Sequence, residues 1–382
     1  MASTVIERTD VLRSLVTSLA QLCDEIGVLS TTIGLEPGAV SGGTPSWEIA
    51  LRNDFDRLLH DSAARSTLER RLDQVSTRLE ELLEPARPGR GRALYIALES
   101  GATREAIVHR ALPTGARVGP VAHVLPLLSV LGEGERSGLV SASRDAISVQ
   151  ESELGTVRDV DHIELEPSVG DWWPEMKGPA RANPVRGQHM VSQRDRYERR
   201  VAAAYCHTLN DAAVAIALLA VERGWRRAVL AGDPRRTDIL DAVLRERGLT
   251  TSTIEANLEG VRTEDAHRRL EHALEAVVAR QRVELAKDVV SAEKGVCGLV
   301  PVLAVLAEAR ADSLLIDPSR SYPGVVGPDG AMSAAPPGAD AIDLTDLIVA
   351  RALATDAAVV PVSDEAAGVL AVVEGLAATL RW

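Results

Sequence analysis

The sequence predicts a mixed α/β protein of three domains. Its 382 residues are enough for two or three domains of ordinary size. Hydrophobic residues make up 46% of the chain and aromatic residues only 3%, so the chain can bury cores and these should be aliphatic. Short apolar runs alternate with stretches of helical period, an order that is typical of α/β layers.

The first predicted domain, residues 1–135, is an α/β domain. Leucine and valine residues between positions 68 and 82 recur at helical spacing, and the apolar run 94–98 has the composition of a central strand. The expected helices cover residues 5–23, 47–62 and 65–84, and the expected strands cover residues 28–35, 94–98 and 106–110.

The second predicted domain, residues 136–262, is a mostly parallel α/β domain with a long basic helix. The turn signal Arg144-Asp145 between two short β runs predicts a hairpin over residues 139–149. Asp233-Pro234 after an apolar run predicts a buried strand followed by a capped helix start. The other expected elements are a strand at 157–165, the long helix at 191–223, and strands at 227–233 and 250–254.

The third predicted domain, residues 263–382, is an α/β/α sandwich. A charged helix over 263–286 opens it, and Ser313 to Asp317 is the expected buried strand. The Pro- and Gly-rich stretch 318–338 is predicted to be a long surface loop. The apolar run 366–380 is too short to span a bilayer and is predicted to be a buried helix.

The most informative stretch is a basic segment, residues 177–200, which joins a Gly- and Pro-rich loop to the start of the long helix. It holds seven Lys and Arg residues against two acids, whereas the whole chain has a formal net charge of −13. A concentrated positive segment on an acidic protein points to an anionic target, such as RNA phosphates. A solvated helix face beside a loop is the alternative. The candidate RNA-binding residues are Lys177, Arg181, Arg186, His189, Arg194, Arg196, Arg199 and Arg200.

Few other patterns in the sequence indicate chemistry. There is no Walker loop, dinucleotide fingerprint, HExxH or GxSxG pattern. The turn 231–236 either binds a phosphate at a helix start or is an ordinary turn with an aspartate cap, and we favour the second interpretation. Trp172 and Trp173 either stack on bases or fix their own loop. The eight histidines lack metal-ligand spacing, so we expect neither a metal nor a cofactor.

The cysteines and the N-terminal sequence indicate the cellular compartment of the protein. Cys23, Cys206 and Cys297 are far apart and have no CxxC spacing, so they are predicted to be reduced thiols. No uninterrupted apolar region precedes a small-residue cleavage site near the N-terminus. We therefore expect a cytoplasmic protein without a membrane segment.

Two patterns carry a family resemblance. Arg186-Gly187-Gln188 leads into the arginines that begin at Arg194, and Glu293 to Leu306 is followed by Ala311 to Ile316. The first is similar to a Gly-Gly-Gln loop followed by an Arg-rich helix. The second is similar to a Gly-Leu pair, an apolar helix and a Leu-Leu-Ile strand. In this order the segments resemble the bacterial branch of the archaeo-eukaryotic release factor superfamily, which includes Pelota.

The resemblance implies a ribosome-binding translation factor with no DNA target. Bacterial members of similar layout include a ribosome hibernation factor, which implies binding in the ribosomal A site under stress or stalling. The same resemblance implies that the third domain meets a translation GTPase such as elongation factor Tu.

Two other functions stay open at this point. One is a peptidyl-tRNA hydrolase that would use Gln188 and Gly187. Arg186 replaces the first glycine of the family's loop, and its side chain restricts the backbone angles that glycine supplies, so we favour a binding factor. The other is an interaction protein that makes no contact with the ribosome.

Overall fold

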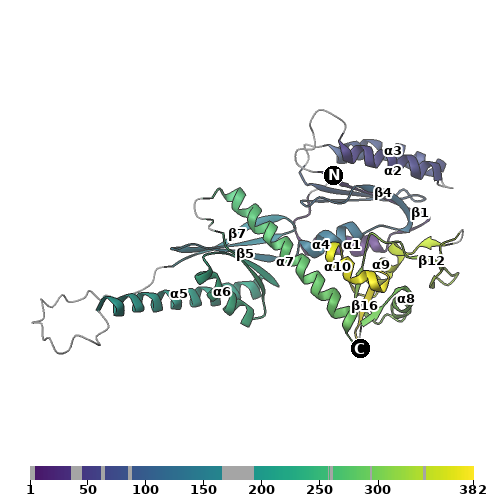
Figure 1. Ribbon diagram of the computed structural model, residues 1–382. Coiled ribbons are helices and arrows are strands. Elements are labelled where there is room, and N and C mark those ends of the chain that lie inside the picture. The colour runs from purple at the N-terminus through teal and green to yellow at the C-terminus, as the bar shows by residue number, and fades with distance from the viewer. Residues whose placement is uncertain are drawn as a thin grey trace, which may run out of the picture. The chain divides into compact units, whose positions relative to one another are not determined.

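The computed structural model describes most of the chain, namely residues 5–35, 45–61, 65–84, 88–165, 193–256, 258, 261–292, 295–338 and 341–382. The chain divides into two compact units (Figure 1). The first unit contains residues 1–135, 153–156 and 278–382, and the second contains residues 136–152 and 157–277. The predicted mixed α/β class is confirmed, because helices and sheets occur in both units. The division into three domains stays a prediction.

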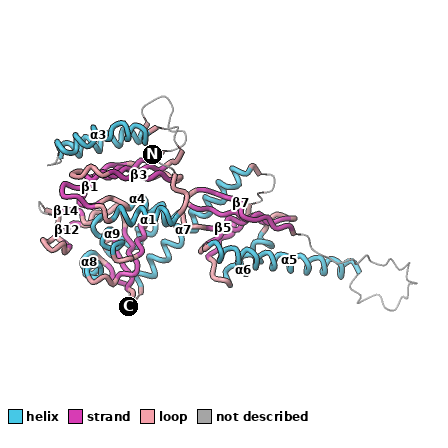
Figure 2. The backbone as a smooth tube through the Cα atoms, turned by 180° about the vertical axis from the view of Figure 1, so that it is seen from behind, coloured by secondary structure: helices cyan, strands magenta, loops and turns pink. Residues whose placement is uncertain are grey.

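An antiparallel sheet of strand order β3-β2-β1-β4 forms the N-terminal part of the first unit. Its strands are β1 (Cys23–Gly34), β2 (Gly91–Ala97), β3 (Thr103–Val108) and β4 (Gly115–Val121). Successive residues of β1 point to opposite faces, so Leu29 joins the cluster of α2 (Ser46–Asp61) and α3 (Arg65–Leu83). Val28 joins the cluster of α1 (Thr9–Ala20) and α4 (Leu125–Glu133) on the other face. The sheet therefore lies between two helical layers (Figures 1 and 2).

A second sheet, of order β10-β16-β11-β15, forms the C-terminal part of the first unit. It consists of β10 (Gly295–Cys297), β16 (Leu376–Leu380), β11 (Ala311–Ile316) and β15 (Ala358–Pro361). Leu314 of β11 packs on the side of α8 (Leu299–Ala307) and α9 (Thr345–Ala354). Leu315 packs on the side of α7 (Thr263–Ser291) and α10 (Asp364–Leu370). This is the predicted α/β/α sandwich.

Two predictions in the last third of the chain are wrong. Residues 366–380 do not form one helix, because α10 and a 3₁₀ turn end at Glu374 and Gly375, which have φ of +62° and +78°. The following residues form β16 instead. The predicted loop 318–338 contains β12 (Pro323–Val326) and β13 (Met332–Ala334), which build a small antiparallel sheet with β14 (Ile342–Asp343).

The second unit is built on a sheet of order β7-β6-β5-β8-β9. Its strands are β5 (Ser137–Ala142), β6 (Ala146–Glu153), β7 (Thr156–Glu164), β8 (Arg227–Gly232) and β9 (Thr250–Ile254). The pairs β5–β8 and β8–β9 are parallel, whereas β5 and β6 form the predicted antiparallel hairpin. Helices α5 (Gln193–Arg223) and α6 (Pro234–Glu246) cover one face, and the start of α7 covers the other.

Within the described residues one helical stretch, Ala203–Arg223, is long and apolar enough to cross a membrane by length and composition. Leu209, Ala213 and Ile216 of this stretch lie in the core of the second unit. Packing inside a folded domain therefore accounts for its apolar composition.

Candidate nucleic-acid interface

Helix α5 carries the end of the basic segment, and its C-terminal half is held in the core of the second unit. Buried residues recur there at spacings of three and four, as expected for one face of a helix. They pack against β5, β6, β8 and α6. These residues are Leu209, Ala212, Ala213, Ile216, Ala217 and Ala220.

Residues around Trp225 fix the C-terminal end of α5. Gly224 has φ +72°, which lets the chain turn back, and the Trp225 amide donates to the Ala220 carbonyl at 2.8 Å. The Trp225 indole Nε1 donates to Glu151 Oε2 at 2.6 Å. Arg223 lies 3.7 Å from the other oxygen of the Glu151 carboxylate. The helix is thus anchored at its end through β6.

The N-terminal half of α5 extends past this core. Among the described side chains of α5, Leu209 is the first that is buried. It lies roughly 24 Å along the helix axis from Gln193, at about 1.5 Å per residue. Tyr205 packs at the edge of the core, and its hydroxyl donates to the Arg144 carbonyl at 3.2 Å. Figures 1 and 2 both show α5 continuing beyond the strands of its own unit. The backbone of residues 193–200 therefore stands away from the core.

The predicted site residues fall in two groups. Arg194, Arg196, Arg199 and Arg200 belong to the first eight residues of α5, so the prediction of a helix there is confirmed. The remaining predicted residues lie outside the described residues, and their roles stay predictions. They are Lys177, Arg181, Arg186, Gly187, Gln188 and His189, together with Trp172 and Trp173.

The turn between β8 and α6 has the structure that we favoured. The Asp233 carboxylate accepts from the Arg235 amide at 2.9 Å, and Pro234 occupies the first helical position. This is an aspartate cap. Among the described residues there is no cluster of three or more His, Cys, Asp or Glu side chains that could hold a metal ion.

A polar cluster that no pattern in the sequence indicates lies in the first unit. His123 Nδ1 is 2.6 Å from Asp346 Oδ1, and Arg117 contacts the same histidine nitrogen at 3.2 Å. His123 and Asp346 are 223 positions apart in the chain. No local spacing pattern could have joined them, so this cluster is visible only in the folded protein.

The comparison with protein families concerns mainly the second unit. Residues 123–277 match the model of bacterial archaeo-eukaryotic release factor family 10. This stretch of the chain is similar to the bacterial archaeo-eukaryotic release factors. Helix α5 and the Arg186-Gly187-Gln188 stretch both lie inside the matched residues. The predicted family resemblance is supported at the level of the superfamily, over the residues that the family model matches.

Several solved structures are similar over nearly the whole chain. Archaeal translation termination factor aRF1 has 17% identity and a TM-score of 0.26, with 98% of each chain covered. Archaeal Pelota, in a model of ribosome-bound Pelota and ABCE1, has 11% identity and a TM-score of 0.39, with 99% of this chain and 95% of that chain covered. Pelota of Archaeoglobus fulgidus has 12% identity and a TM-score of 0.34, with 99% and 94% covered. At these values the likeness carries no argument about activity. No curated protein matches the chain.

Proposed function

We propose that this protein is a cytoplasmic ribosome-associated factor that binds the ribosomal A site, as a hibernation or stalled-ribosome factor under stress. The observation that carries the proposal is helix α5 of the second unit. Its C-terminal half is fixed in the core, and its first turns, with Arg194, Arg196, Arg199 and Arg200, extend beyond that core. Arginines in the sequence of such a helix can bind the phosphates of an RNA groove.

The proposal is tested by sedimentation of the protein with ribosomes from growing and from starved cells. Replacing the four arginines by alanine removes up to four phosphate contacts. Affinity for ribosomes should fall, and the slope of log K against log salt should become shallower by about 3. Unchanged co-sedimentation of this variant would remove the ribosomal role that we assign to α5.

A matched control separates this local effect from the overall charge. Four exposed arginines outside α5 are replaced by alanine, which gives a variant of the same net charge. Its ribosome affinity and salt dependence should stay close to those of the unchanged protein. The four residues are Arg52, Arg65, Arg268 and Arg280.

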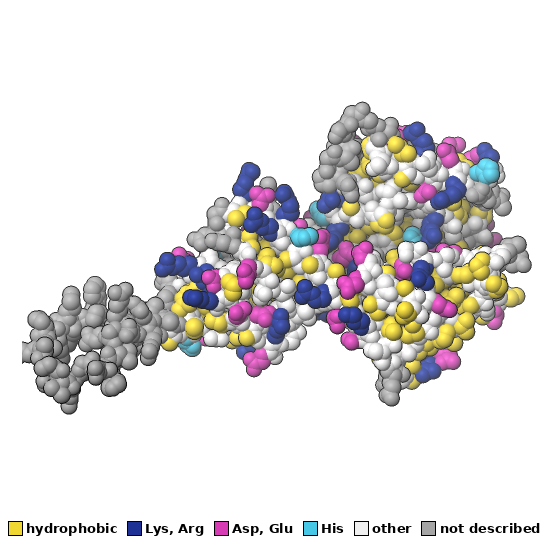
Figure 3. All heavy atoms as spheres, in the orientation of Figure 1, with side chains coloured by type: hydrophobic (Ala, Val, Ile, Leu, Met, Phe, Trp, Pro, Cys, Tyr) yellow, Lys and Arg dark blue, Asp and Glu magenta, His cyan; other side chains and the backbone are white. Residues whose placement is uncertain are grey.

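Elongation factor Tu is the partner that we propose for the C-terminal part of the first unit. Val300 of α8 is 65% exposed, and Val326 and Ile342 on the neighbouring small sheet are also exposed. Figure 3 shows hydrophobic side chains gathered over α8 and β12, beside a pocket of about 470 Å³ that Tyr322 lines. An apolar patch with a pocket is the kind of surface that binds another protein.

Retention of elongation factor Tu on the immobilised protein tests this partner. Val300→Glu should weaken retention, because it places a charge in the patch. Val372→Glu is the control, since Val372 is 81% exposed and lies in the 3₁₀ turn Ala371–Val373 that follows α10. Equal retention by both variants and the unchanged protein would exclude this surface.

The second candidate function is peptidyl-tRNA hydrolysis, which the Arg186-Gly187-Gln188 sequence favours. Under the A-site binding proposal, ribosomes carrying peptidyl-tRNA should release no peptide above background on addition of the protein. Arg186→Gly, which restores two glycines before Gln188, could then create some release. Strong release by the unchanged protein that is lost in Gln188→Ala would make the hydrolase the better account.

A further inference from the structure

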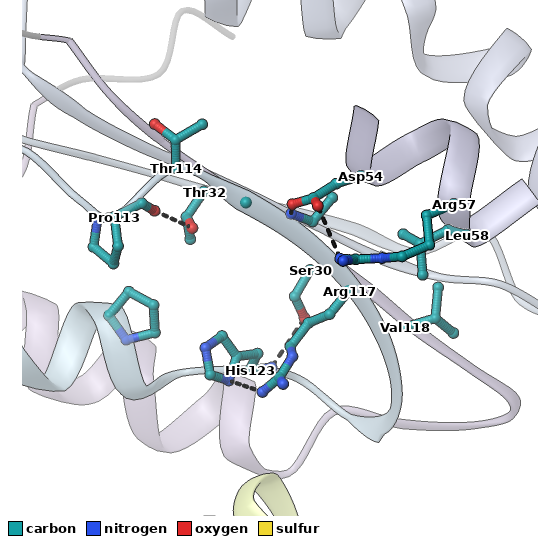
Figure 4. Close-up of a pocket in the computed structure, with 13 residues that line it drawn as sticks. Ser30, Thr32, Asp54, Arg57, Leu58, Pro113, Thr114, Arg117, Val118 and His123 are labelled. Carbon is teal, nitrogen blue, oxygen red and sulfur yellow. Dashed lines mark hydrogen bonds and ion pairs between the residues drawn. The ribbon is translucent and has the colours of Figure 1, made fainter. Parts of the chain in front are cut away.

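A polar pocket of about 380 Å³ lies in the first unit, between α2 and the strands β1 and β4 (Figure 4). Arg57 borders it from α2, and Arg117 and His123 border it from β4 and the segment that follows. Hydroxyl groups of Ser30 and Thr32 line the wall that β1 forms. The pocket is far from α5 in sequence, and the proposed role of α5 does not use it.

Arg57 can donate hydrogen bonds beyond the one that it makes to Asp54. Its Nη2 donates to Asp54 Oδ1 at 2.8 Å, while Asp54 Oδ2 accepts from the Ala116 amide at 3.0 Å. Both oxygens of that carboxylate are therefore engaged, and Arg57 neutralises its charge. Within the described part of the chain, the Nε and Nη1 groups of Arg57 make no hydrogen bond. The Arg57 side chain is 65% exposed and can turn toward a ligand.

Arg117 is held by charge but is not saturated by hydrogen bonds. Its guanidinium nitrogens lie 3.6 Å from Asp346 Oδ2 and 3.7 Å from Asp343 Oδ2, which is beyond good hydrogen-bond distance. Arg117 Nη1 is 3.2 Å from His123 Nδ1. That nitrogen is also 2.6 Å from Asp346 Oδ1, so Arg117 and Asp346 share one histidine nitrogen, and a guanidinium group has five N–H donors. Arg117 therefore keeps donors for a further partner.

The acids around the pocket are already engaged. Each oxygen of Asp54 accepts one hydrogen bond, and Asp346 is largely buried with its Oδ1 2.6 Å from His123 Nδ1. Asp343 Oδ1 accepts from the amides of Tyr322 and Thr345 at 3.2 and 3.1 Å. The pocket thus presents mainly N–H donors, and two of its walls each contribute a guanidinium group.

We propose that this pocket binds a phosphate group, with Arg57 and Arg117 as the donors. Guanidinium groups bind phosphate oxygens through paired N–H donors and keep their charge at every physiological pH. The phosphate belongs either to a free mononucleotide or to an RNA strand. This site does not involve α5, so a test that refutes it leaves the proposed ribosomal function unaffected, and the reverse is also true.

Isothermal titration of the full chain with inorganic phosphate, a nucleoside monophosphate and a short single-stranded RNA tests the proposal. The RNA arm uses a chain in which the four α5 arginines are already alanine, which reduces the contribution of the basic segment, and the pocket variants are compared in that same background. Binding of the mononucleotide without RNA identifies a free nucleotide, and the reverse identifies an RNA phosphate. No binding of any probe at millimolar concentration overturns the proposal.

Three variants locate the binding. Arg57→Ala and Arg117→Lys should each weaken binding by about tenfold or more, the second because lysine lacks the paired donors. Arg117→Lys retains the charge beside Asp343 and Asp346, and thermal unfolding checks that it folds. Arg52→Ala is the matched control, since Arg52 is an equally exposed arginine of α2 that pairs with Glu48 and does not line the pocket. An equal loss in Arg52→Ala, or unchanged binding in both pocket variants, would refute the site.

Discussion

Glu374 shows how one side chain can hold two distant segments together. Gly298 precedes α8 and has no side chain that could cap the helix, and Glu374 Oε2 accepts from the Leu299 amide at 2.8 Å instead. Glu374→Ala should lower the free energy of unfolding by about 1 kcal/mol, as loss of a helix cap does. Glu374→Gln keeps an oxygen acceptor and the same backbone, so urea denaturation should show a smaller loss. No loss in Glu374→Ala would show that the cap contributes nothing.

Asp343 makes stability depend on pH. Burial alone raises its pKa, but hydrogen bonds from Thr345 and the Tyr322 amide, with the charge of Arg117, hold the pKa below its ordinary value of 3.8. A lowered pKa in the folded state stabilises the protein above the unfolded pKa, and this contribution is lost as the pH falls through the folded value. Asp343→Asn should therefore destabilise the protein at neutral pH and less so at about pH 3.

Denaturation at the two pH values measures this effect. The exposed Asp312 provides the control, since Asp312→Asn should change stability little at either pH. A loss in Asp343→Asn that is the same at both pH values would contradict the ionised carboxylate.

Local residue patterns could be predicted from the sequence, and distant ones could not. Asp233-Pro234 identified a capped helix start because cap and helix are adjacent in the chain. The His123–Asp346 pair depends on two segments 223 positions apart, and no spacing indicates it. The phosphate pocket was missed for the same reason. The basic segment was found because its charges lie close together in the sequence.

Helix α5 gives a prediction at the level of one element. Ile216 is fully buried in the core of the second unit, whereas Leu218 on the same helix is 62% exposed. Ile216→Ala should lower the free energy of unfolding by about 2–5 kcal/mol. Leu218→Ala should change it by no more than about 0.5 kcal/mol. Similar losses in chemical denaturation would contradict the anchored face of α5.

Elements with a clear period were predicted better than short ones. The long helix and the β5–β6 hairpin follow from period and turn signals. The last strand, β16, was predicted as helix because its alanines and leucines suit a helix as well. The reversal at Glu374 and Gly375 places it between β10 and β11, where pairing with two neighbours overrides local preference.

The two ends of the chain share one hydrophobic core. Leu12 near the N-terminus and Ile348 near the C-terminus belong to the same buried cluster, whereas Leu240 belongs to the second unit. In calorimetry, Leu12→Ala and Ile348→Ala should lower the midpoint of one and the same transition. Leu240→Ala should lower the midpoint of a different transition. Separate transitions for Leu12 and Ile348 would support independent N- and C-terminal domains.

The central claim is that the protein occupies the ribosomal A site, and two exposed cysteines allow it to be tested. Cys206 lies on α5 and Cys23 begins β1, and both are free and exposed. Chains that retain only one of them, with serine at the other cysteine positions, can carry an iron chelate that cleaves nearby RNA. If the protein occupies the A site, chelates at Cys206 or Cys23 should cleave ribosomal RNA that lines the A site. Absence of cleavage from both, or cleavage only at sites outside the A site, would contradict the claim.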